Sequence, residues 1–168
     1  MFEAIKKMFG MEVEKSPLSA LFVELNELGR KQTVMPIEIF GLSTRLAESA
    51  EGAERQVVVS TLLKDYVAHK NAFVRRAATI AFRRMDDLDN PAITEAVYER
   101  LSDENSWVVY DAAWFFQKHN CATGKITEKL QEIAGEAAKY DLEELEVPFD
   151  FVSDADLQAR YMAAKALR

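Results

Sequence analysis

The stretch Asn71-Ala-Phe-Val-Arg-Arg-Ala-Ala-Thr-Ile-Ala-Phe82 decides the fold, because the chain repeats its pattern twice more. The second copy is Asn105-Ser-Trp-Val-Val-Tyr-Asp-Ala-Ala-Trp-Phe-Phe116, and the third is Asp156-Leu-Gln-Ala-Arg-Tyr-Met-Ala-Ala-Lys-Ala-Leu167. In each copy a polar residue and two spacers precede an apolar residue, and small or apolar residues follow it four, seven and eight places on. This spacing puts all four apolar positions on one stripe of an α-helix.

The three copies define a repeat with one set of core positions. The first two copies begin 34 residues apart, at 71 and 105, and the last two begin 51 apart, at 105 and 156. A period in this range is typical of a helical solenoid. The predicted core positions are Val74, Ala78, Ala81 and Phe82, then Val108, Ala112, Phe115 and Phe116, and finally Ala159, Ala163, Ala166 and Leu167.

The rest of the chain also shows helical spacing and few breakers. Proline follows Ser16 and stands again at positions 36 and 91, and proline is favoured in the first turn of a helix. The predicted helical pairs are 17–31 with 36–49, 54–68 with 72–85, 91–102 with 106–119, and 125–139 with 157–168.

These residues resemble the HEAT family of helical repeats. The second helix of a HEAT hairpin typically begins with Val-Arg, continues with small residues, and follows an aspartate by five positions. Val74-Arg75 matches that start, Asp103 and Asp154 occupy the aspartate position, and Arg160 occupies the arginine position. Two positions depart from the pattern: His69 replaces the first aspartate and Val109 replaces the second arginine. The resemblance covers about residues 54–168 and is inferred for 16–50.

The resemblance implies an all-α, right-handed α-solenoid of about four hairpins in a single domain, 1–168. The expected units are a degenerate first hairpin at 16–50 and repeats at 54–86, 91–120 and 125–168, the last with an acidic insertion at 141–156. Residues 1–15 are expected to form a short amphipathic helix, with Phe2, Ile5, Met8 and Phe9 on one face. It is expected to cap the open end of the solenoid, with membrane contact as the alternative.

Composition limits where the protein works and what it binds. The one cysteine, Cys121, cannot form an internal disulfide, which favours a reducing compartment, and we expect a cytoplasmic protein. No apolar run approaches the roughly 20 residues that span a bilayer, so stable membrane insertion is not expected. The net charge of −7 opposes non-specific binding to nucleic acid, which depends on phosphate neutralisation.

Motifs for catalysis are not found in the sequence. It has no Gly-rich phosphate loop, no nucleophile elbow and no Cys or His cluster at metal-ligand spacing. His119 and Cys121 are two residues apart, so on a helix they point away from each other. We therefore expect neither an enzyme nor a cofactor or metal site, with Cys121 a small hydrophobe at a helix end.

One helix face combines arginine with aromatic residues. If the core positions point inward, the opposite faces of the second helices carry Arg76, Arg83, Tyr110, Trp114 and Tyr161. In the HEAT family these helices line the concave surface, so the resemblance implies a groove floored by these five side chains. Such residues are the typical hot spots of protein interfaces. The alternative is that Trp114 and Ile80 are packing residues, because solenoid helices bury two flanks.

These observations predict a non-enzymatic adaptor or inhibitor that binds another protein, for example a basic toxin blocked by an acidic immunity-type protein. The acidic stretch 141–156 is a second candidate contact. The competing function is nucleic-acid binding by a protein related to the HEAT-like DNA glycosylases. We rank it lower because few lysine and arginine side chains lie in the groove. The resemblance also implies a structural Arg75–Asp103 pair between neighbouring repeats and a local Asp154–Arg160 pair.

Overall fold

The computed structural model describes residues 16–86, 90–135 and 154–168, and within these ranges the chain is helical and has no strand. The prediction of an all-helical chain is therefore confirmed for this part. Its elements are α2 (Pro17–Leu28), α3 (Pro36–Ser49), η1 (Gly52–Glu54), α4 (Arg55–Thr61), η2 (Leu62–Tyr66), α5 (Ala72–Arg84), α6 (Pro91–Arg100), α7 (Ser106–His119), α8 (Lys125–Ala134) and α9 (Ala155–Ala166).

Side-chain caps fix where the main helices begin. The carboxamide oxygens of Asn71 and Asn105 accept hydrogen bonds from backbone N–H groups in the first turns of α5 and α7. Asp154 does the same for α9, accepting from the N–H groups of Asp156 and Leu157. Such caps satisfy donors that the first helical turn leaves unpaired. Asp154 starts α9 two residues earlier than predicted, so Asp156 lies inside the helix.

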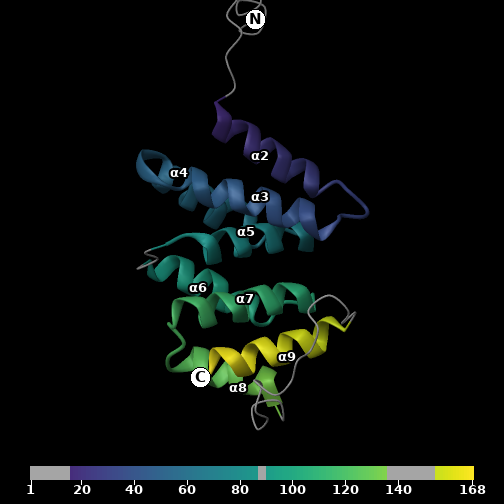
Figure 1. Cartoon of the computed structure of the whole chain (residues 1–168), viewed down its shortest axis with the longest axis vertical. Coiled ribbons are helices and arrows are strands. Elements are labelled where there is room, and N and C mark those ends of the chain that lie inside the picture. The colour runs from purple at the N-terminus through teal and green to yellow at the C-terminus, as the bar shows by residue number, and fades with distance from the viewer. Residues whose placement is uncertain (1–15, 87–89, 136–153) are drawn as a thin grey trace, which may run out of the picture.

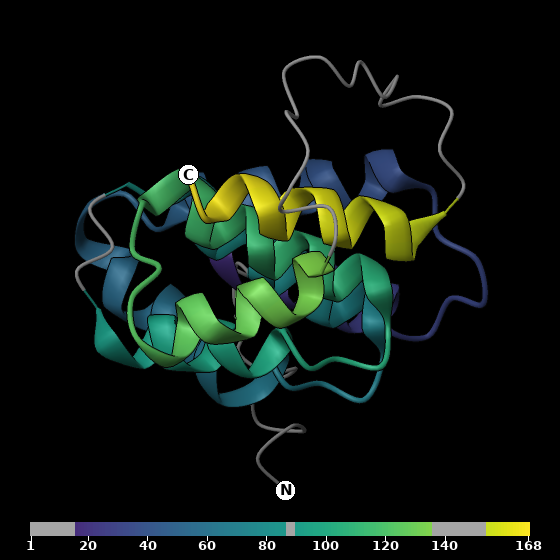
Figure 2. The ribbon, with the colours of Figure 1, turned by 90° about the horizontal axis from the view of Figure 1, so that it is seen from below.

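The helices form two layers along the long axis of the molecule. In one layer α3 packs on α5, α5 on α7 and α7 on α9 (Figure 1). The other layer contains α4 with its continuation η2, α6 and α8, which pack against the first layer and against each other (Figure 2). Helix α2 covers α3 and α5 at the end of the stack. Each helix of the first layer thus lies between two others of that layer or at its end.

The predicted core stripe lies between the layers. All four stripe residues of α5 and all four of α7 are buried, with Phe82, Phe115 and Phe116 among the largest buried side chains. In α9 the first two stripe residues, Ala159 and Ala163, are buried, whereas the last two are half-buried near the end of the chain. The predicted core residues are thus buried in α5, in α7 and in the first half of α9, and in α5 the residues between them are buried as well.

Two further predictions fall outside the described residues. These are the amphipathic helix at 1–15 and the acidic insertion, of which only positions 154–156 are described. The second helical pair is also interrupted, because α4 continues into a π-helical turn in which the N–H of Val67 donates to the carbonyl of Leu62. Among the described helices, none has the length and apolar character needed to cross a bilayer.

Candidate partner-binding surface

A buried ion pair joins the first turn of α5 to the loop that precedes α7. Arg75 donates to both carboxylate oxygens of Asp103, at 2.8 and 2.7 Å, and both side chains are nearly inaccessible, with exposed fractions of 6% and 3%. The same guanidinium donates to the backbone carbonyls of His69 and Lys70. Arg75 therefore ties its own helix start to that of the next repeat, as predicted.

His69 takes the place of a repeat aspartate in the first copy. Its Nδ1 accepts the N–H of Asn71 at 3.1 Å, and a carboxylate oxygen of Asp103 accepts the N–H of Asn105 at 3.0 Å. Both bonds run from position i+2 to position i and hold the capping asparagine in place. The substitution noted in the sequence therefore preserves one local interaction. Asp154 caps α9, whereas Arg160 is exposed on that helix.

Next to this pair, Arg76 forms a second buried ion pair across α5 and α7. Its Nε donates to Oδ2 of Asp111 at 2.7 Å, and Asp111 is completely buried. Burial raises the pKa of Asp111, and the positive charges of Arg76 and Arg83 oppose that rise. The second carboxylate oxygen, Oδ1, has no hydrogen-bond partner in the described part of the chain.

Arg83 lies seven residues, about two helical turns, after Arg76 on α5, and it contacts an aromatic ring. Its guanidinium carbon is 3.5 Å from the centroid of the Trp114 ring, and the side chain is buried, with 5% exposed. Burial lowers the pKa of Arg83, and its Nη1 has no hydrogen-bond partner among the described residues. Arg76 sits over Trp107 in the same way, at 5.3 Å. Cation–π contacts of this kind stabilise a guanidinium that has lost its water.

Tyr110 completes this set of rings. It contacts Trp107 on one side and Trp114 on the other, both edge to face, with centroids 5.7 and 5.6 Å away. Burial raises the pKa of Tyr110 far above its ordinary range, so the phenol stays neutral. We call Arg76, Arg83, Trp107, Tyr110, Asp111 and Trp114 the arginine–aromatic cluster.

The structure therefore brings together four of the five residues predicted to bind a partner. Arg76, Arg83 and Tyr110 are buried instead of exposed, because the rings of α7 lie over the arginines of α5. Trp114 on α7 and Tyr161 on α9 pack against the core and remain partly exposed. Partner binding by these residues stays a prediction, now with Trp114 and Tyr161 as its accessible members.

Sequence reasoning missed Trp107 and Asp111. A signal was available for Asp111, because it is the single acid within the apolar run from Trp107 to Phe116. An acid in the middle of a buried helix needs a cation nearby. Trp107 is four residues before Asp111 and three before Tyr110, so the three share one helix face.

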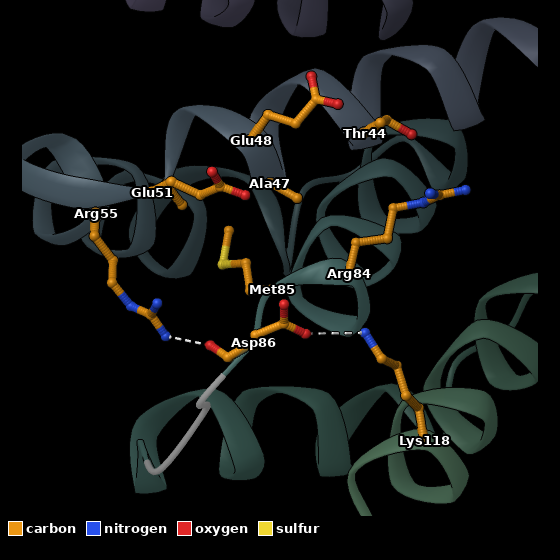
Figure 3. Close-up of a pocket in the computed structure, with 10 residues that line it drawn as sticks. Thr44, Ala47, Glu48, Glu51, Arg55, Arg84, Met85, Asp86 and Lys118 are labelled. Atoms are coloured by element: carbon orange, nitrogen blue, oxygen red, sulfur yellow. Dashed lines mark hydrogen bonds and ion pairs between the residues drawn. The ribbon is translucent and has the colours of Figure 1, made fainter.

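A pocket of about 400 Å³ opens beside the cluster, where α3, α5 and α7 end and α4 begins (Figure 3). Arg55 donates to the backbone carbonyl of Asp86 at 2.6 Å, and Lys118 pairs with the Asp86 carboxylate at 3.6 Å. Arg84 lines the pocket and is exposed, and its guanidinium extends away from Met85 and Asp86 (Figure 3). The lining residues are Thr44, Ala47, Glu48, Ala50, Glu51, Arg55, Arg84, Met85, Asp86 and Lys118.

Groups with catalytic or metal-binding potential are few in the described part of the chain. It contains no cluster of His, Cys, Asp or Glu that could hold a metal ion. His119 contacts the Phe115 ring, and its Nε2 is 3.1 Å from the carbonyl oxygen of Arg83. Burial lowers the pKa of His119 and raises that of the half-buried Cys121 thiol, which stays protonated. A protonated thiol is a poor nucleophile.

Comparison with family models, curated proteins and solved structures found no match for this chain.

Proposed function

We propose that this chain is a non-enzymatic protein-binding module of the HEAT-like type. The layer α3, α5, α7 and α9 would line the concave side of a right-handed solenoid of about four hairpins. Three observations support the proposal: the repeated core stripe, the Arg75–Asp103 link between neighbouring repeats, and the order in which helices of this layer pack on one another. The single cysteine fits work in the cytoplasm.

The observation that carries the proposal is that the Trp114 ring is fixed by its neighbours and is still accessible to solvent. Its ring contacts Tyr110 and the guanidinium of Arg83 and packs against the core, yet it remains partly exposed on α7. A large ring that is already fixed loses little conformational entropy when a partner covers it. Tryptophan beside tyrosine and arginine is also the composition of interface hot spots. The proposed binding surface is therefore centred on Trp114, with Tyr161 at its edge.

Nucleic-acid binding is the competing proposal. Arginine and aromatic side chains together can clamp phosphates and stack on bases. Here, however, the guanidinium of Arg76 pairs with Asp111 and that of Arg83 is covered by Trp114, and both side chains are buried. Strong binding to duplex DNA typically involves about six to ten phosphate contacts from exposed lysine and arginine side chains. Burial of these arginines thus favours a protein partner.

The test is affinity capture from the native host, read by mass spectrometry, with wild type and Trp114→Ala. Tyr110 is buried, so its substitution would confound binding with folding. The matched control is Tyr98→Ala, because Tyr98 is half-buried on α6 in the other layer. We expect a protein that wild type and the control capture and Trp114→Ala loses, while circular dichroism shows all three folded. Equal capture by Trp114→Ala, or recovery of nucleic acid alone, would contradict the proposal.

A further inference from the structure

The pocket of Figure 3 contains one cation that the fold does not use. Arg84 is exposed, and no carboxylate of the described residues lies within 4.0 Å, the ion-pair distance, of its guanidinium. The two other cations of the pocket, Arg55 and Lys118, are both engaged with Asp86. Arg84 therefore has its full set of donors available to a ligand.

The surroundings of Arg84 make anion binding favourable at this one position. Arg83, the preceding residue, is buried with an unpartnered Nη1, so its positive charge is only partly compensated by Asp111. The Lys118–Asp86 pair is open to solvent, with the Asp86 side chain 90% exposed. Such exposed ion pairs contribute little free energy to stability. Lys118 can therefore exchange Asp86 for the carboxylate of a ligand with little loss of free energy.

The remaining lining limits the ligand to one negative charge with apolar neighbours. The carboxylates of Glu48 and Glu51 stand at the rim and repel a polyanion (Figure 3). The buried side chains of Ala47, Ala50 and Met85 provide an apolar floor. A nucleic-acid backbone, which brings a phosphate at every nucleotide, meets the rim acids, whereas one carboxylate on an aliphatic stem meets the floor and Arg84.

The pocket lies one turn of α7 away from the surface proposed for partner binding. Lys118 lies four residues after Trp114 on α7, so both side chains are on the same face one turn apart. A bound segment can therefore cover the Trp114 ring and place an acidic side chain in the pocket.

We propose that this pocket accepts a single glutamate or aspartate side chain of the protein partner, whose carboxylate pairs with Arg84. This inference rests on the proposed function and specifies the chemistry of its partner. It differs from the expectation of a basic partner drawn from the net charge of −7, because Arg84 lines the pocket without a carboxylate partner among the described residues.

The experiment uses the full chain and two blocked tripeptides, acetyl-Leu-Glu-Leu-amide and acetyl-Leu-Gln-Leu-amide. Arginine Nε–H resonances of ¹⁵N-labelled protein report binding at Arg84. We expect saturable shifts with the glutamate peptide, at least about tenfold weaker binding of the glutamine peptide, and loss of the difference in Arg84→Gln. Arg30→Gln, an exposed arginine after α2, is the matched control and should bind as wild type.

Equal binding of both peptides, or unchanged binding to folded Arg84→Gln, would overturn the inference, and so would tighter binding of a thymidine oligonucleotide to this pocket. Affinity capture distinguishes failure of this inference from failure of the proposed function. A partner lost with Trp114→Ala but retained by Arg84→Gln leaves the proposed function standing and refutes the carboxylate pocket.

Discussion

At the residue scale, buried arginines hold the first layer together. Arg75 satisfies a carboxylate and two backbone carbonyls, whereas Arg76 donates to one oxygen of Asp111 while its guanidinium lies over Trp107. A buried charge that is paired as completely as Arg75 is tolerated, but loss of either partner leaves the other unpaired in a low-dielectric interior. These residues are therefore expected to matter for stability more than for binding.

Removing Arg75 tests this role. We expect Arg75→Ala to lower the free energy of unfolding by about 3–5 kcal/mol, because Asp103 would remain buried without its bidentate partner. Urea denaturation followed by circular dichroism measures the change. Glu104→Ala is the control, because the Glu104 side chain is 85% exposed and its contact with Arg75 is long, 3.3 Å. If Arg75→Ala lost partner capture while its stability stayed unchanged, Arg75 would contact the partner and would not have the structural role.

His119 predicts a pH dependence of stability. Burial lowers its pKa below the ordinary 6.5, so between the two pKa values the unfolded chain binds more protons than the folded one. The contribution of His119 to stability is therefore fully present above about pH 6.5 and is lost as pH falls through the folded pKa. Wild type should lose stability relative to His119→Gln from pH 7.5 to 5.5 in urea titrations. Parallel pH profiles for the two proteins would argue against this assignment.

At the element scale, caps and terminators place the ends of the helices. Asparagine starts both α5 and α7, and α7 also ends on an asparagine, because Asn120 adopts the left-handed conformation with φ of 47°. Asparagine tolerates this conformation better than other side chains, and glycine adopts it without steric cost. The end of α7 is thus a local property of the sequence that also positions His119 and Lys118.

Two substitutions of Asn120 are expected to change stability in opposite directions. Asn120→Gly should raise the free energy of unfolding by up to about 1 kcal/mol, and Asn120→Ala should lower it by about 1 kcal/mol, since only the second change adds strain at positive φ. Asn90→Gly is the comparison at a φ of −130°, where glycine relieves no strain and the change also removes the side-chain cap of α6, so it should lower the free energy of unfolding. Thermal unfolding followed by circular dichroism gives the ranking. An Asn120→Ala protein as stable as wild type would rule out strain at this position.

At the scale of the whole molecule, the first layer is continuous from α3 to α9. Helix α5 is buried from Val74 through Arg83, because α3 and α7 pack on its two flanks and the other layer packs beneath it. The arginine–aromatic cluster bridges α5 and α7 in the middle of this layer. Stability of such stacks depends on interfaces between nearest neighbours.

The two tryptophans, both in the cluster, allow cooperativity to be measured. Unfolding followed by tryptophan fluorescence reports the interface of α5 and α7, whereas circular dichroism reports all helices. We expect one midpoint from both probes, because the central interface cannot open without exposing the stripe residues of α5 and α7. A fluorescence transition at lower urea than the dichroism transition would show that the centre of the stack opens first.

The sequence by itself predicted the helices and the core positions, and the resemblance to the HEAT family implied the Arg75–Asp103 pair. Helical periodicity is local, so core positions such as Val74 and Ala78 could be assigned from spacing alone. The tertiary structure alone decided which predicted surface residues remain accessible. Arg76, Arg83 and Tyr110 are buried because α7 packs close enough to α5 for its rings to cover the arginines, and no residue spacing within one helix sets that distance. The pocket at Arg84 has the same origin, since its walls come from helix ends that are far apart in the chain.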